Sequence, residues 1–193
     1  MVDPIERRRV IIDALFDVVI EAGIEQVSLR RVAEAAGLVV GSVRHYFASY
    51  DELLGDAAVE IVERISERLA RHVPRLEEAD DRLDVAVDML SELVPMDRPR
   101  AREVTVWLEI AVAARVDTRL TETASRLLAG SRQLATVIFE RSGAIPAETI
   151  PLEAERLAAL VDGLALRATL HGLPAATVRD VLRHHLHRVR AGG

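Results

Sequence analysis

The chain has 193 residues, of which half are apolar, and a net charge of −6 at pH 7. This length allows one substantial core or two small ones, and 29% charged residues are typical of a folded globular protein. Cysteine is absent, which excludes disulfides and thiolate sites. No apolar run approaches the roughly 20 residues of a membrane span, and no segment has the pattern of a secretion signal. The sequence therefore predicts a cytoplasmic protein without membrane association.

Apolar residues recur with helical periodicity along nearly the whole chain, and no stretch alternates as a strand does. We therefore predict an all-α protein of about nine helices. They are expected at about 5–22, 29–36, 40–46, 51–72, 80–94, 99–115, 118–142, 151–171 and 175–190. Ser28 is a natural N-cap for the second helix, and Gly23 and Gly37 are expected to end the first two, because glycine adopts the backbone conformation that closes a helix.

Residues 28–54, SLRRVAEAAGLVVGSVRHYFASYDELL, have the pattern of a helix-turn-helix. Val32, Ala33 and Ala36 form a small inward face on the first helix, and Val43 and Phe47 anchor the second helix from beneath. The outward positions of the second helix are then Val40, Gly41, Ser42, Arg44, His45 and Tyr46. Small residues at its start permit close approach to DNA bases, and Arg44 can bond a guanine edge or a phosphate.

The local charge supports DNA binding at this segment. Three arginines stand against Glu34 alone between Ser28 and Phe47, in an otherwise acidic chain. Arg7, Arg8 and Arg9 add a basic cluster at the start of the first helix, either toward DNA or as a solvated helix face. Lysine is absent, which leaves arginine for charged phosphate contacts.

The same segment resembles the DNA-binding domain of the TetR family of bacterial regulators over about residues 8–55. Ser28, the run Ala35-Ala36-Gly37, Gly41 and the pair Tyr46-Phe47 match the family pattern, whereas Arg44 and Tyr50 stand where tyrosine and lysine are usual. The resemblance and the pattern together predict a helix-turn-helix domain at residues 1–50 that binds a double-stranded DNA operator. The predicted DNA-binding residues are Ser28, Arg30, Arg31, Val40, Gly41, Ser42, Arg44, His45, Tyr46 and Tyr50.

Residues 51–193 are expected to form a helical ligand-binding and dimerisation domain. The segments at 101–115 and 153–172 are similar to the BetI-type subgroup of the family, and this implies that helices 151–171 and 175–190 contribute to a four-helix bundle in a homodimer. Leucines on more than one face of helix 151–171 agree with burial on two sides. The predicted dimer-interface residues are Leu157, Leu160, Val161, Leu164, Val178, Leu182 and His185.

An effector pocket, if present, is expected between about residues 80 and 142. Its candidate lining is Met89, Leu93, Glu103, Val104, Trp107, Ala111, Leu128 and Phe139. Glu103 and Trp107 are four residues apart and share a helix face, although Trp107 equally fits a simple core position. Because cages for quaternary ammonium groups need several aromatic rings and only Trp107 and Phe139 lie beyond the DNA-binding part, the sequence favours a mainly apolar ligand.

Other patterns carry less chemistry. His184 and His187 are spaced as metal ligands could be, but cationic groups also suit the end of a terminal helix, and no metal site or cofactor is expected. No nucleophile with a base and no phosphate-binding loop occurs, which argues against an enzyme. The sequence predicts a dimeric repressor released by a small effector. The alternatives are an activator, a ligand-independent regulator, or a helical ligand-binding module without DNA affinity.

Overall fold

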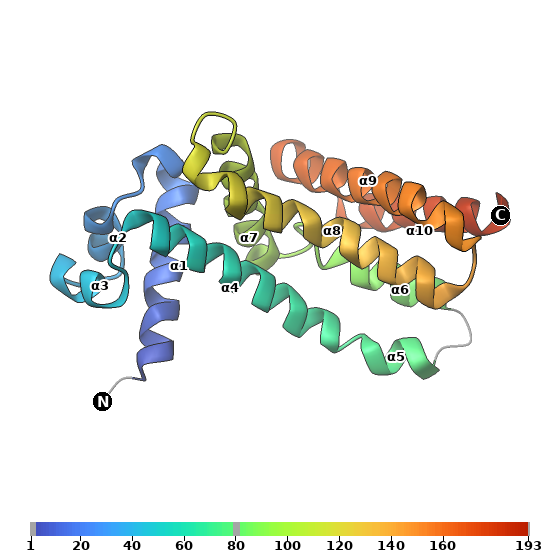
Figure 1. The fold of residues 1–193 in the computed structure, drawn as a ribbon, viewed down its shortest axis with the longest axis horizontal. Helices are drawn as coiled ribbons and strands as arrows, with labels where there is room; N and C mark the ends of the chain where they lie inside the picture. The colour runs from blue at the N-terminus through green and yellow to red at the C-terminus, as the bar shows by residue number, and fades with distance from the viewer. Residues whose placement is uncertain (1–2, 79–81, 193) are drawn as a thin grey trace. The chain divides into compact units, whose positions relative to one another are not determined.

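The computed structural model describes residues 3–78 and 82–192, and over these ranges the chain is α-helical without strands (Figure 1). The helices are α1 (Pro4–Ala22), α2 (Leu29–Ala35), α3 (Val40–Tyr46), α4 (Tyr50–Ala70), α5 (Val73–Glu78), α6 (Arg82–Ser91), α7 (Arg98–Ala113), α8 (Thr121–Ser142), α9 (Ile150–His171) and α10 (Ala175–Gly192). Three short 3-10 helices, η1 (Ile24–Gln26), η2 (Thr118–Leu120) and η3 (Ala147–Thr149), join them. No helix of the described part is long and apolar enough to cross a membrane.

The all-α prediction is confirmed, and the local signals at helix ends act as expected. The Ser28 hydroxyl accepts a hydrogen bond from the Arg31 N–H at 3.2 Å, and Gly23 and Gly37 have φ of 83° and 66°. The short helix α5 was not predicted. Pro74 lies in the first turn of α5, where the missing N–H of proline costs no helical hydrogen bond. This proline therefore follows the end of α4 and also lies at the start of α5.

The described residues pack into two compact units. Unit 1 consists of Met1–Glu63 and Thr105–Leu127, and unit 2 consists of Arg64–Val104 and Leu128–Gly193. The helices α4, α7 and α8 therefore contribute residues to both units. The boundary predicted at residue 50 separates the expected DNA-binding segment from the expected ligand-binding and dimerisation segment, whereas units 1 and 2 are defined by packing.

Unit 1 holds α1, α2, α3 and the part of α4 up to Glu63. Helix α1 packs against α2, and α2 packs against α3. The largest side chains buried in unit 1 have no appreciable exposure: Ile11, Leu15, Phe16, Phe47, Leu53, Leu54 and Ile110. The C-terminal half of α7 joins the unit through Glu109, whose carboxylate accepts a hydrogen bond from the Ile24 N–H of η1 at 3.4 Å.

Unit 2 has its own core between α6, α8, α9 and α10. Each helix presents one apolar face to it, and α6 packs directly against α10. The core includes Val87, Leu90, Ala135, Phe139, Leu157, Val161, Val178 and Leu182. The apolar side chains that the helical periodicity identifies therefore pack mainly against other helices of the same chain.

Most of the predicted dimer-interface residues pack inside their own chain. Five of the seven are already buried by their own chain, with exposures of 0 to 5%, and have no surface left for a partner: Leu157, Val161, Leu164, Val178 and Leu182. Leu160 and His185 keep part of their surface and line a groove between α9 and α10 together with Val181. The outer face of α9 carries Leu152, Leu166 and Leu170, which are exposed.

A half-buried carboxylate on α9 generates a stability prediction. Burial raises the pKa of Asp162 above its ordinary value, and Glu155 adds to this, while a hydrogen bond from Ser131 opposes it. Because the folded pKa exceeds the unfolded one, the charged form weakens the fold, and this loss grows as pH rises through the folded pKa. We expect Asp162→Asn to raise the melting temperature at pH 7, by an amount that shrinks as pH falls toward 4.

Thermal unfolding followed by circular dichroism at several pH values measures this difference. The matched control is Asp180→Asn on α10, an exposed carboxylate 3.5 Å from the Arg183 guanidinium. This control should not increase stability at pH 7. An Asp162→Asn protein that is less stable than the parent at pH 7 contradicts the prediction.

Candidate nucleic-acid interface

The turn between α2 and α3 fixes the angle between these helices. The Leu38 N–H donates to the Ala33 carbonyl at 2.8 Å and the Gly37 N–H to the Glu34 carbonyl at 3.1 Å, which closes the end of α2. Gly37 takes a left-handed conformation that a side chain would strain. Val43 and Phe47 are fully buried beneath α3. The outward face of α3 is therefore held at a fixed orientation.

The residues predicted to bind DNA are divided between exposed and half-buried positions on that face. Gly41, Arg44 and His45 are exposed, whereas Val40, Ser42 and Tyr46 are half-buried, which is less surface than the sequence suggested. The His45 and Tyr46 rings meet edge to face, 5.2 Å apart. Within the described residues the Arg44 side chain has no hydrogen bond or ion pair, which leaves its guanidinium available to a ligand.

The other predicted DNA contacts have partners inside the protein. Arg30 lies 3.6 Å from the Glu34 carboxylate, and the Arg31 guanidinium donates to the Gln26 side chain at 3.1 Å. Both arginines remain exposed, and these pairs lie at the surface, where such contacts are weak and can exchange for a phosphate.

Tyr50 begins α4 and lies beside Arg119, whose guanidinium is 5.9 Å from the ring centre. Arg119 is held by Asp117 at 2.7 Å and by Asp51 at 3.3 Å. Partial burial, together with Asp117, raises the pKa of the Tyr50 hydroxyl. The hydroxyl therefore stays protonated at neutral pH and can donate a hydrogen bond to a phosphate. The lysine that is usual at this position in the family that the segment resembles would do the same.

Arg8 makes contacts that could not be predicted from the sequence. Its guanidinium donates to the Tyr46 carbonyl at the end of α3 at 2.7 Å, forms a short ion pair with Asp56 of α4, and lies 4.4 Å from the centre of the Phe47 ring. Arg8 thus joins α1, the end of α3 and α4. The neighbouring Arg9 pairs with Glu60 at 3.5 Å. The basic cluster at the start of α1 is therefore committed largely to contacts within the unit.

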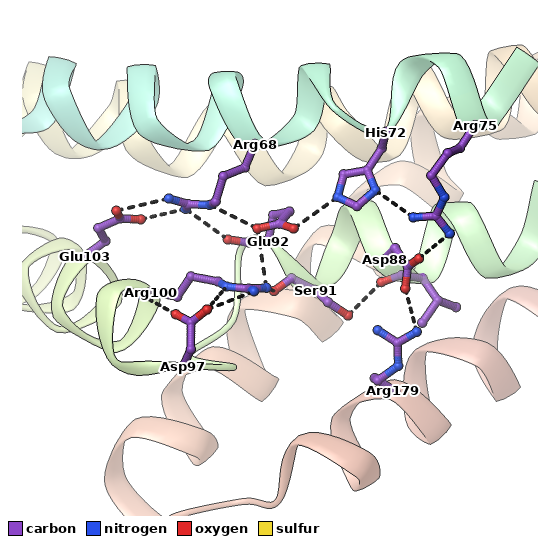
Figure 2. A network of polar contacts seen from close by, with 11 residues as sticks. Arg68, His72, Arg75, Asp88, Ser91, Glu92, Asp97, Arg100, Glu103 and Arg179 are labelled. Carbon is purple, nitrogen blue, oxygen red and sulfur yellow. Dashed lines mark hydrogen bonds and ion pairs between the residues drawn. The ribbon is translucent and has the colours of Figure 1, made fainter.

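Unit 2 contains a second polar cluster, a network of ion pairs (Figure 2). The Arg68 guanidinium donates to both oxygens of Glu103, at 3.1 and 2.6 Å, and to Glu92 at 3.0 Å. Glu92 also contacts His72 at 3.0 Å and Arg100 at 3.3 Å. Glu92 and Glu103 are both more than nine-tenths buried, and their arginine partners compensate the burial of their charges.

The same network continues to α10 through Asp88. Its carboxylate contacts Arg75 at 2.7 Å and Arg179 on α10 (Figure 2). Burial alone would raise the pKa of Asp88, but hydrogen bonds from Arg179 and Arg75 hold it below its ordinary value. Asp88 therefore stays charged, and the pairs hold α6 against α10.

The predicted effector-pocket residues are divided between the two units. Trp107 and Ala111 belong to unit 1, and the other six belong to unit 2. Met89, Val104 and Phe139 are buried, Glu103 is bound by Arg68, and Leu128 is 45% exposed. Phe139 lies at a cavity of about 720 Å³ between α6, α8 and α10, whose lining also includes Ile138, Leu186 and Arg82. The set as a whole remains a prediction.

A short helix held from beneath, preceded by a glycine turn and presenting an exposed basic side chain, defines a helix-turn-helix DNA-binding protein. Comparison with known families gives the same result. The family model described as bacterial regulatory proteins, tetR family, matches residues 11–57, and the model described as BetI-type transcriptional repressor, C-terminal, matches residues 82–191. The chain belongs to the TetR family of transcriptional regulators, with a C-terminal part of the BetI type.

Individual relatives are also transcriptional regulators. The HTH-type transcriptional regulator PksA of Bacillus subtilis is 34% identical over 172 residues, which cover 88% of this chain and 82% of PksA. A transcriptional regulator from Rhodococcus sp. Rha1 has a crystal structure with a TM-score of 0.81 at 29% identity, covering 96% of each chain. The multidrug binding protein EbrR, crystallised with malachite green, has a TM-score of 0.73 at 29% identity, covering 95% of this chain and 98% of EbrR. PksA and the Rhodococcus protein are transcriptional regulators and not enzymes.

The position of Arg8 predicts a loss of DNA binding without direct contact to DNA. Replacing Arg8 with alanine removes a charge-assisted hydrogen bond from the end of α3, a partly exposed contact that we value at about 1–2 kcal/mol. We expect Arg8→Ala to lower operator affinity about tenfold and Arg8→Lys to recover only part of it, because lysine lacks the planar fork. Fluorescence anisotropy with labelled operator DNA measures both affinities.

The salt dependence separates positioning from a phosphate contact. Loss of one phosphate contact reduces the slope of log affinity against log salt by about 1. A positioning role leaves the slope of Arg8→Ala unchanged. Arg126→Ala is the matched control, because Arg126 is an exposed arginine on α8 that, among the residues the structure describes, pairs with Glu122 alone, at 2.5 Å. Parental affinity in Arg8→Ala would show that the contact does not orient α3.

Proposed function

We propose that this TetR-family regulator is a homodimeric repressor that a small, mainly apolar effector releases from a palindromic operator. The observation that carries the DNA-binding part is the unpaired, exposed Arg44 on a helix that Val43 and Phe47 hold from beneath. Such a helix lies in the major groove of DNA, where a bidentate arginine contact to guanine is the commonest specific one.

Dimerisation is proposed because one such module buries too little surface for tight, specific binding, and two symmetric modules read a palindrome. The proposed interface is the outer face of α9, where Leu152 is 66% and Leu170 is 64% exposed, with Leu166 beside them. Gly163 shares this face, and no atom lies within 4 Å of a Cβ built there, which leaves room for a partner helix. The groove between α9 and α10 at Leu160 and His185 continues this surface.

The effector is proposed to bind among the unit 2 helices. The mainly apolar side chains at Met89, Leu93, Val104 and Phe139 support an apolar ligand. EbrR, which binds malachite green, supports the use of the same fold for ligands with a large apolar body. We propose that binding changes the contacts of Arg68 near the end of α4, a helix that begins beside the DNA-binding motif at Tyr50. By linkage, operator and effector must weaken each other's binding equally.

Two alternatives remain within the regulator class, an activator and a regulator without an effector. Both share the operator-binding step with the proposed function, and they differ from it in the effect on transcription or in the response to a small molecule. A helical ligand-binding module without DNA affinity is a third alternative, and a binding assay separates it from the others.

The operator-binding proposal predicts that Arg44 carries specific affinity. In a mobility-shift assay with DNA from upstream of the protein's own gene, we expect Arg44→Ala to weaken the complex by about 1–3 kcal/mol, or roughly five- to 150-fold, because one base contact is lost. Arg126→Ala removes the same charge from an exposed site and should bind as the parent does. A shift that neither the DNA sequence nor Arg44→Ala affects would refute specific recognition by α3.

The proposed interface predicts a change of oligomeric state. Replacing the exposed Leu170 with glutamate places an uncompensated charge into the contact between two copies of α9, and we expect a monomer in light scattering after size exclusion, with unchanged helical content. Val112→Glu, at a residue of α7 that is 67% exposed, is the matched control and should remain dimeric. A dimer that persists in Leu170→Glu would move the interface elsewhere.

A further inference from the structure

An apolar side chain lies directly before α3, the helix proposed to enter the major groove, and most of its surface is exposed. Val39 is 72% exposed, and the next residue, Val40, is half-buried. Val39 occupies the N-cap position of α3 and provides no side-chain hydrogen bond there. Exposure of a branched apolar side chain contributes nothing to folding, and the same position would favour a polar cap.

The other α-helices that begin in the N-terminal part of unit 1 show what the local structure prefers. The side chain of Asp3 caps α1 through the Ile5 N–H at 3.0 Å, Ser28 caps α2 at 3.2 Å, and Ser49 caps α4 through the Glu52 N–H at 3.1 Å. Replacing such a cap by an apolar residue costs about tenfold in the equilibrium for helix formation. The stability of the isolated chain therefore does not explain why a valine stands at position 39.

The chemistry of the major groove supplies a partner for this side chain. Valine has no hydrogen-bond donor or acceptor, and the apolar group that base pairs present in the major groove is the C5-methyl of thymine. Gly41, which is exposed and has no side chain, lets this end of α3 approach the base edges closely. We propose that Val39 contacts a thymine methyl group in each operator half-site and so contributes to operator specificity. This inference rests on the proposed operator binding.

The test removes the methyl group alone. An operator is first selected from a random duplex library with the full-length protein, and each of its thymines is then replaced by deoxyuridine, which keeps every hydrogen-bonding group. Burial of one methyl group changes affinity about fourfold. We expect one thymine in each half-site at which deoxyuridine weakens binding about fourfold, and about fifteenfold when both half-sites carry it.

A protein variant then assigns the methyl contact to Val39. In Val39→Ser, which restores a polar cap, the operators with thymine and with deoxyuridine at that position should bind equally. Val112→Ser, at an exposed valine of α7, should keep the parental difference. The inference is overturned if no thymine shows a methyl effect, or if the effect persists in Val39→Ser. If the library yields no bound duplex, operator binding itself is overturned, and this inference with it. That result differs from a failure of the methyl contact alone, in which an operator is selected but shows no methyl effect that depends on Val39.

Discussion

The hydrogen bond from the Arg8 guanidinium to the Tyr46 carbonyl is the contact on which the DNA-binding surface depends. Helix α3 has only seven residues, and a helix of this length is not stable by itself in water. Its position must therefore come from tertiary contacts, which include its packing against α2, Val43 and Phe47 beneath it, and Arg8 at its C-terminal end. One planar cation stacks on the Phe47 ring, satisfies a helix-end carbonyl and pairs with Asp56, a combination that lysine cannot make.

The parts of unit 1 that could be predicted from sequence are those that local chemistry decides. Ser28 and Gly37 set the limits of α2 whatever else the chain does, and the predicted bounds of α3 match the structure. Arg8 left one usable signal, because it stands four and seven residues before the buried Ile12 and Leu15 and so shares their helix face. Its partner Asp56 lies 48 residues away, and periodicity does not identify a contact of that kind.

Helix α9 shows why periodicity alone does not locate a dimer surface. Its leucines cover more than half of the helix circumference, and periodicity reveals that two faces are apolar without showing which one meets the chain's own core. Leu157, Val161 and Leu164 face α6 and α10 in the core, whereas Leu152 and Leu170 lie outside it. The sequence identifies the apolar stripe, but only packing distinguishes an internal surface from an external one.

The ion-pair network of unit 2 bears on the chemistry of the effector. Glu103 is the acidic residue of the predicted pocket, and its burial is tolerated because Arg68 binds both of its oxygens. A cationic ligand that used Glu103 would have to displace this arginine and leave a second buried charge, Glu92, with less compensation, at a cost of about 3–5 kcal/mol. An apolar ligand meets no such cost. In the folded protein, the acidic residue predicted to line the pocket is therefore already paired and is not free to act as the counter-charge of a ligand.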